Sequence, residues 1–271
     1  TSFNQPLGNW NTGSVTNMQQ MFGSASAFNQ PIGNWNTGNV TNMQALFANA
    51  NSFNQPIGNW NTSNVTNMVS MFRGASSFNQ PIGSWNTGNV TDMEKMFSYT
   101  SSFNQPIYNW NTINVIRMTE MFENATAFNQ YLDSWNVSWV INMQRVFNGA
   151  TSFNQSLANW KLRPIGVNMT SIFNNSGMNC SNYSATLIGW ASASSGPYTV
   201  YFGALGINYG TNAIAARNYL INTKNWVFNG DIPSGVICCV PTYSATVYLN
   251  HCKSYFFNGQ TLTSSGIYYD T

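Results

Sequence analysis

The stretch FNQPIGNWNTGNVTNM, residues 28–43, decides the fold, because nearly the same letters return at residues 53–68 and 78–93. Each return comes after 25 residues, and phenylalanine and tryptophan keep this step over seven copies. A fixed period of 20–50 residues is typical of solenoids, in which each repeat is one coil stacked on its neighbours. We number the coils 1 to 7 by their first residues, which are Phe3, Phe28, Phe53, Phe78, Phe103, Phe128 and Phe153.

A single repeat has too few apolar side chains to offset the conformational entropy lost on folding, so stacked coils must share their apolar faces. The in-phase residues therefore predict ladders through the stack. The apolar ladders are Phe28, Phe53 and Phe78, and Trp35, Trp60 and Trp85. A polar ladder is expected at Asn29, Asn54 and Asn79, where amides would pair with buried backbone; a ligand-binding role is the weaker alternative.

Local patterns within a repeat predict its secondary structure. Residues 34–40, NWNTGNV, combine Trp, Thr and Val, which favour extended backbone and predict one short strand. Residues 41–50 predict one or two helical turns, because Thr41 and Gln44 match a capping box and the apolar residues after them fall at helical spacing. The FNQPIG segment predicts a bend.

These elements predict an α/β repeat fold: a right-handed, leucine-rich-repeat-like solenoid with one short parallel strand and one short helix per coil, followed by a small β module. We expect residues 1–176 to form the solenoid of seven copies and residues 177–233 to cap its end. Residues 237–271 are expected to form a small, incomplete β-rich module, because YSATVYLN alternates apolar and polar residues.

The composition narrows the range of functions. Charged residues make up only 6% of the chain and its net charge is +2, with no cluster of Lys or Arg, so a nucleic-acid partner is not expected. No apolar run is long enough for a membrane span. No phosphate-binding, nucleophile or metal-ligand motif appears either, so we expect no cofactor, no metal and no catalysis.

Four cysteines follow the repeats, at Cys180, Cys238, Cys239 and Cys252. Their spacing matches no zinc site, and His251 is the only histidine in the sequence. Two readings stay open: buried thiols, or a disulfide of Cys238 or Cys239 with Cys252, which an extracellular setting favours.

The expected strands carry one threonine per coil, and these threonines would form a row across the sheet. This row is a candidate binding face for a protein, a glycan or another copy of the chain. The alternative is a polar ladder with a structural role. The row consists of Thr12, Thr37, Thr62, Thr87 and Thr112.

The sequence FNQPIGNWNTSNVTNMVSMF, residues 53–72, resembles the 25-residue repeat of BspA-like and mycoplasma-lipoprotein-type bacterial surface proteins. The resemblance covers residues 1–176, although the copies at Phe128 and Phe153 lack the proline. Residues 254–271 resemble a β-rich module of large secreted Bacteroidota proteins. The resemblance implies an extracellular, cell-surface location and a type IX-like secretion route. The implied partners are a surface protein or glycan, other copies of the chain, or secretion and surface-anchoring proteins.

We therefore expect a non-enzymatic adhesin or binding module. The main alternative is a structural spacer or a component of a surface layer or filament, and an enzyme is a third, weaker possibility. Faithful repeats and low charge favour the spacer, because a dedicated site needs a coil that differs on its exposed face. The family resemblance favours adhesion.

Overall fold

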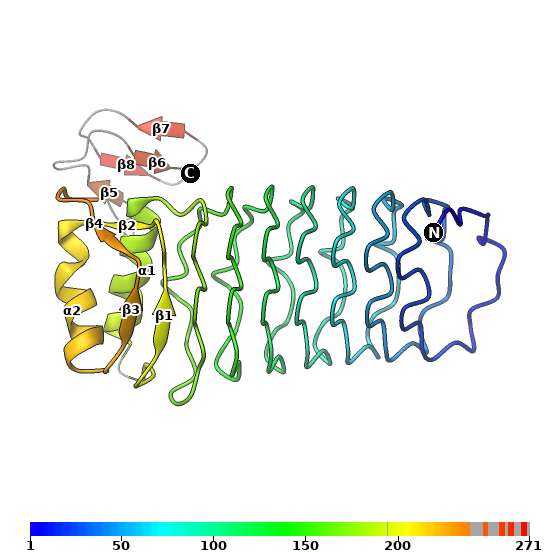
Figure 1. The fold of residues 1–271 in the computed structure, drawn as a ribbon, viewed down its shortest axis with the longest axis horizontal. Coiled ribbons are helices and arrows are strands. Elements are labelled where there is room, and N and C mark those ends of the chain that lie inside the picture. Colours follow the sequence, from blue (N-terminus) through cyan, green and yellow to red (C-terminus); the bar gives the residue numbers. More distant parts are fainter. Residues whose placement is uncertain (194, 239–245, 249–254, 258–259, 263–266, 270–271) are drawn as a thin grey trace.

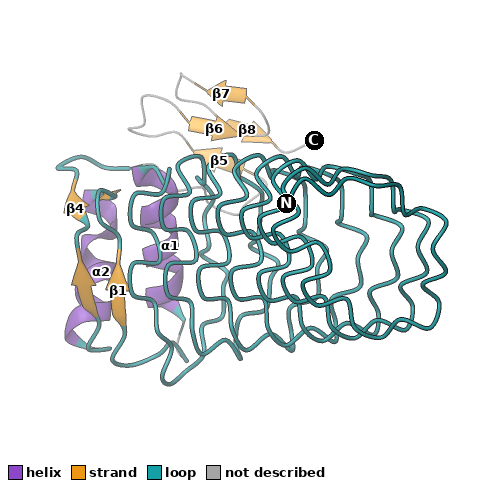
Figure 2. Ribbon diagram, turned by 45° about the vertical axis from the view of Figure 1, so that its right-hand side comes forward, coloured by secondary structure: helices purple, strands orange, loops and turns teal. Residues whose placement is uncertain are grey.

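The computed structural model describes residues 1–193 and 195–238, together with the backbone of strands β5 (Thr246–Tyr248), β6 (Tyr255–Phe257), β7 (Gln260–Leu262) and β8 (Ile267–Tyr269). The coils stand side by side along one long axis, with the N-terminus towards one end and the helices at the other (Figure 1). Figure 2 shows that the walls of this stack consist of loops and turns. The 25-residue repeat thus builds a solenoid, as predicted.

The short strand expected over residues 34–40 does not form. The side-chain Oδ1 of Asn36 accepts a hydrogen bond from the N–H of Gly38 (3.1 Å), and the N–H of Val40 donates to the carbonyl of Thr37 (3.0 Å). Asparagine can satisfy its own backbone two residues on, which closes a turn in place of a strand. The strand prediction is therefore wrong for this segment.

The helix expected over residues 41–50 is also wrong, because a ribbon of turns replaces it. Ala45 and Asn49 have φ angles of 52° and 58°, in the left-handed region that ends a helix. The N–H of Ala45 donates to Val69 in the next coil (2.8 Å), whereas the N–H of Leu46 donates to Met43 in its own coil (3.2 Å). Alternate N–H groups thus bind carbonyls of the neighbouring coil. A helix would direct these N–H groups to its own carbonyls and leave those of the neighbouring coil unpaired.

The residues of the expected capping box make other contacts. Thr41 Oγ1 donates to the carbonyl of Thr16 in the preceding coil (3.2 Å), and the N–H of Gln44 donates to Asn42 Oδ1 (3.0 Å). Asn42 belongs to a column of single-residue parallel bridges that runs through the whole stack. Its members are Asn17, Asn42, Asn67, Asp92, Arg117, Asn142 and Asn168.

The predicted apolar ladders are confirmed. Phe28 and Phe53 stack with ring centroids 5.9 Å apart, and Trp35 and Trp60 stack at 6.4 Å with rings nearly parallel. From coil 2 to coil 7, the tryptophan of this column also donates its indole N–H to a carbonyl of the preceding coil, as Trp60 does to Ile32 (3.1 Å). The tryptophan column therefore joins the coils by both apolar packing and hydrogen bonds.

Regular elements continue the stack after coil 7. In chain order they are α1 (Cys180–Ser192), β1 (Tyr201–Gly203), β2 (Asn208–Tyr209), the 3₁₀-helix η1 (Thr211–Ala213), α2 (Ile214–Asn222), β3 (Val227–Asn229) and β4 (Ile232–Pro233). Strand β1 pairs in parallel with β3, and β2 pairs in parallel with β4. Trp190 in α1 and Trp226 before β3 extend the tryptophan column, with indole N–H bonds to Leu157 and Pro197, both of 2.9 Å.

A buried ion pair closes this end of the stack. Arg217 of α2 donates from Nε and Nη2 to the two carboxylate oxygens of Asp231, both at 2.8 Å, and Tyr183 of α1 donates its hydroxyl to Asp231 at 3.0 Å. Burial and the charge of Asp231 hold the pKa of Tyr183 well above its ordinary value. Asp231 thus connects both helices to the turn between β3 and β4.

The four C-terminal strands pair antiparallel, β5 with β8 and β6 with β7. These pairs fall within the segment for which a β-rich module was expected. The division of the chain at residues 176, 233 and 237 stays a prediction.

Candidate binding surface

The asparagine that follows each phenylalanine binds the next coil. Asn29 Oδ1 accepts hydrogen bonds from the N–H of Asn54 (2.9 Å) and from Nε2 of Gln55 (3.1 Å), and Asn54 Oδ1 accepts from the N–H of Asn79 (2.9 Å). The side-chain amides therefore join coil to coil, as the structural reading of this ladder predicted.

The threonine row proposed as a binding face lies in the interior. Its exposed fractions are between 1% and 4% for Thr12, Thr37, Thr62, Thr87 and Thr112. Thr37 Oγ1 donates to the carbonyl of Asn61 in the next coil (3.0 Å), and its neighbours in the row make the same bond. The placement of this row on an exposed strand face is wrong, because these side chains point into the wall and pair with backbone.

A different threonine column is exposed, and the sequence reasoning missed it. It consists of Thr16, Thr41, Thr66 and Thr91, each directly after the valine column of its coil. The N–H of Thr41 donates to the carbonyl of Thr16 (2.9 Å), and the column continues with Ile116 and Ile141, which make the same bond at 2.8 Å and 2.9 Å. The sequence did contain a signal for this exposure. Buried and exposed positions alternate around the valine, so the residue that follows the buried valine faces solvent.

Five large side chains that break the repeat are exposed near this column, and we call them the corner patch. Their exposed fractions are Ile113 46%, Ile116 41%, Trp139 65%, Ile165 77% and Tyr198 53%. Coils 1 to 4 carry glycine or serine at the position of Ile113, threonine at that of Ile116, and serine or asparagine at that of Trp139. The exposed surface thus changes from small and polar to large and apolar along the stack.

Backbone pairing places the corner patch along one corner of consecutive coils. Asn142 pairs with Asn168, and Trp139 and Ile165 each lie three residues before their member of that pair. Ile165 in turn pairs with Tyr198 at the start of the next turn of chain. The patch therefore runs from coil 5 to the segment between α1 and β1.

Basic residues lie close in sequence to members of the corner patch. Lys161 and Arg163 occupy the same segment of coil 7 as Ile165, and neither forms an ion pair with any residue that the structure describes. Arg117, next to Ile116, binds Asp92 of the preceding coil (3.0 Å). Two cations that form no ion pair within the described residues therefore lie shortly before Ile165 in the chain.

The acidic residues of coil 5 lie in the ribbon of turns. Glu123 is 6% exposed and accepts a hydrogen bond from Asn148 Nδ2 in coil 6 (2.9 Å), with Arg145 Nη1 at 3.8 Å. Burial raises the pKa of Glu123, and the neighbouring Glu120 raises it further. Glu123 thus takes part in the contact between two coils.

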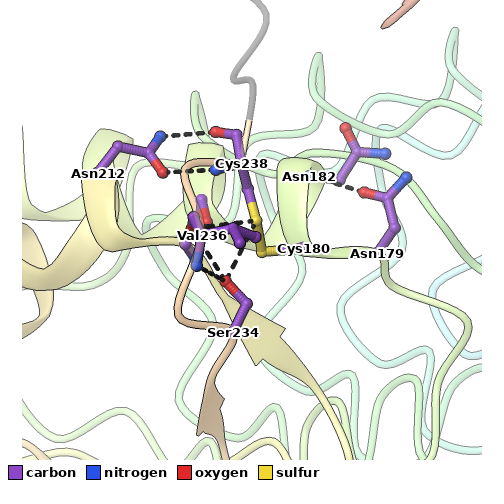
Figure 3. Close-up of a disulfide and its surroundings, with 9 residues drawn as sticks. Asn179, Cys180, Asn182, Asn212, Ser234, Val236 and Cys238 are labelled. Atoms are coloured by element: carbon purple, nitrogen blue, oxygen red, sulfur yellow. Dashed lines mark hydrogen bonds between the residues drawn. A yellow bond between two sulfur atoms is a disulfide. The ribbon is translucent and has the colours of Figure 1, made fainter. Parts of the chain in front are cut away.

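The disulfide differs from the predicted one. Cys238 pairs with Cys180 at the first position of α1, with a Cα–Cα distance of 5.7 Å, and not with Cys252 (Figure 3). Asn212 holds the chain there, because its Nδ2 donates to the carbonyl of Cys238 (2.7 Å) and its Oδ1 accepts from the N–H of Cys238 (3.0 Å). A bond between Cys239 and Cys252 lies outside the described residues.

A shallow hollow of about 430 Å³ lies over the turns of coils 1 to 3. Its lining is Gln20, Gly23, Ser24, Gln44, Ala45, Ala48, Asn49, Ser70 and Arg73.

Within the described part of the chain, no group of three or more His, Cys, Asp and Glu side chains could hold a metal ion. None of the helices described there has the length and apolar character needed to cross a membrane.

The comparisons with known proteins concern the repeats. No curated protein and no solved structure matches the chain. The family model described as "Mycoplasma protein of unknown function, DUF285" matches residues 1–98 and 77–186, which include all seven coils. Because these matches cover more than half of the 271 residues, the chain belongs to the DUF285 family.

Proposed function

We propose that this solenoid is a non-enzymatic binding module of a cell surface, of the adhesin type, and that it binds through the corner patch. The proposal includes the finer resemblance to BspA-like repeats, a right-handed course of the coils and an extracellular location. Regular solenoids commonly serve recognition, because stacked repeats present long surfaces.

The observation that supports binding is that the exposed positions of coils 5 and 6 change while the buried ladders persist. Asn114 donates from Nδ2 to the carbonyl of Gly88 in the preceding coil (2.7 Å), and Asn39, Asn64 and Asn89 make the same bond. Trp139 stands at this position in coil 6, and its indole side chain is 65% exposed. Coil 6 thus gives up a stacking bond of about 1 kcal/mol and presents an indole to solvent, which favours recognition.

A structural spacer, or a component of a surface layer or filament exported by a type IX-like route, is the second candidate. It is favoured by coils 1 and 2, which carry no charged residue and repeat with few changes. Such coils suit close packing beside other surface material. A spacer gains nothing from the corner patch, however, so we place binding first.

The test restores the repeat on the exposed corner of the full chain. The triple variant Ile113→Ser, Ile116→Thr, Trp139→Asn carries residues that other coils hold at the same positions, so we expect it to fold. The matched control is Tyr99→Asn, which removes an exposed aromatic ring from the ribbon of turns, where other coils carry asparagine.

Both variants and the parent chain would be screened against proteins, glycans and lipid vesicles, with their size measured by light scattering. Saturable binding that the triple variant loses and the control keeps supports the proposal. Assembly of the parent chain without any ligand, kept in the triple variant, supports the spacer instead. Turnover of a substrate contradicts both.

A further inference from the structure

We infer that the corner patch binds the surface of a lipid bilayer that carries anionic head groups. This inference rests on the proposed binding function and names its partner. Three features of the patch favour this partner: its exposed apolar side chains, its basic neighbours in the sequence and its alignment along the stack.

The side chains of the patch are apolar or amphipathic and face solvent. Trp139 and Tyr198 have amphipathic rings, which favour the boundary between water and hydrocarbon. Ile113, Ile116 and Ile165 add branched aliphatic side chains that are between 41% and 77% exposed. Side chains of this kind lie at the level of the head groups and upper acyl chains when a protein binds a membrane surface.

The residues that precede Ile165 in coil 7 are basic. Lys161 and Arg163 have no carboxylate partner among the described residues, and the nearby Asp92 is bound to Arg117. Basic side chains close to an anionic leaflet increase affinity roughly fivefold each, and the gain falls with salt. The patch therefore has the charge that complements anionic head groups.

The residues of the patch form a row along the stack. Its residues occupy the same corner of consecutive coils, and the corners of the coils line up along the edge of the stack (Figure 1). Such a row can touch a flat surface with all its members. A glycan site needs several converging polar groups, which three isoleucines do not provide.

The experiment measures flotation of the full chain with vesicles of phosphatidylcholine alone or mixed with phosphatidylglycerol. We expect binding to the anionic vesicles and at least a tenfold loss of affinity in the variant Ile113→Ser, Ile116→Thr, Trp139→Asn. The variant Lys161→Gln, Arg163→Gln should lose roughly 30-fold on anionic vesicles, and high salt should have the same effect on the parent chain. Tyr99→Asn should bind as the parent does.

A second readout reports direct contact. In a Trp10→Phe background, Trp139 is the one exposed tryptophan, because the other eight are at most 4% exposed. Brominated lipids should therefore quench its emission on binding.

The outcomes of these experiments test the lipid partner separately from the proposed binding function. Vesicle binding that the triple variant retains overturns the inference, and so does vesicle binding without quenching of Trp139. If the chain ignores vesicles but binds a protein or glycan through the patch, the lipid partner is wrong and the binding function stands. Absence of binding to all three classes overturns both.

Discussion

Replacement of Trp60 by alanine tests the stacked array in its centre. Trp60 is 3% exposed, stacks on Trp35 at 6.4 Å and lies 6.1 Å from the ring of Phe47. Loss of a buried indole typically costs about 3–5 kcal/mol through the cavity that remains. The carbonyl of Ile32 also loses its donor, which adds about 1 kcal/mol or more. We therefore expect a loss of about 4–6 kcal/mol in the free energy of unfolding.

Urea denaturation followed by circular dichroism measures this loss, provided that the slope of the transition is compared as well as its midpoint. Two further variants divide the effect. Trp60→Phe keeps most of the apolar packing and should lose about 1–3 kcal/mol, which reflects the unpaired carbonyl. Trp10→Ala should lose about 1–2 kcal/mol, because Trp10 is already 55% exposed and stacks on Trp35 alone among the rings described.

Equal losses for Trp60→Ala and Trp10→Ala would refute the reasoning, because a stacked array makes the cost depend on the number of neighbouring coils. A loss below about 2 kcal/mol at Trp60 would also contradict it, since the column would then not be close-packed.

Three other changes test separate contacts. Thr62→Val should cost about 1 kcal/mol, because the buried Thr62 hydroxyl no longer donates to the carbonyl of Asn86 (2.9 Å). Thr66 Oγ1 donates to the carbonyl of Thr41 (3.3 Å) in an exposed bond that water can replace, so an equal loss for Thr66→Val would contradict this. Gly58→Ala should lower the free energy of unfolding by more than about 1 kcal/mol, because a Cβ there would lie 2.6 Å from the carbonyl oxygen of Pro81. An unchanged urea midpoint would contradict this, since the coils would then have moved apart to admit the methyl group. The raised pKa of Glu123 means that the folded chain holds this proton more tightly, so its contribution to stability is present below the ordinary pKa and is lost as the pH rises through the folded value. Glu123→Gln should therefore stabilise the chain at neutral pH more than at pH near 4, and equal shifts of the melting temperature at the two pH values would contradict this.

The long-range organisation could be predicted from the sequence because the period alone brings equivalent residues together. Phe28 and Phe53 must meet if each repeat is one coil, whatever the local backbone does. The local backbone could not be predicted, because Thr41 and Gln44 match a helix start only when a segment is considered by itself. In the stack, the N–H of Ala45 binds the next coil, and this contact outweighs helix propensity.

The prediction of the binding face failed at one step. Thr37 and Thr41 both recur in every early coil, and the error was to place Thr37 outside, on a strand that does not form. The departures at Ile116 and Trp139 are visible in the sequence, but their exposure follows only once the turns are known. The pairing of Cys180 with Cys238 was equally out of reach, because it depends on the return of the chain over α1 after β4.

The disulfide also determines how the protein carries mechanical load. Tension applied to the chain beyond Cys238 passes through the sulfur atoms to Cys180, 58 positions earlier in the sequence, so the interval between the two cysteines is left out of the force-bearing path. The helices and short strands of that interval would stay folded while the coils bear the pull. Reduction would place the interval in series with the coils and add about 200 Å of extensible chain. Under load, the oxidised protein would therefore yield by the parting of stacked coils, and the reduced protein by the unravelling of the helices and short strands between the two cysteines.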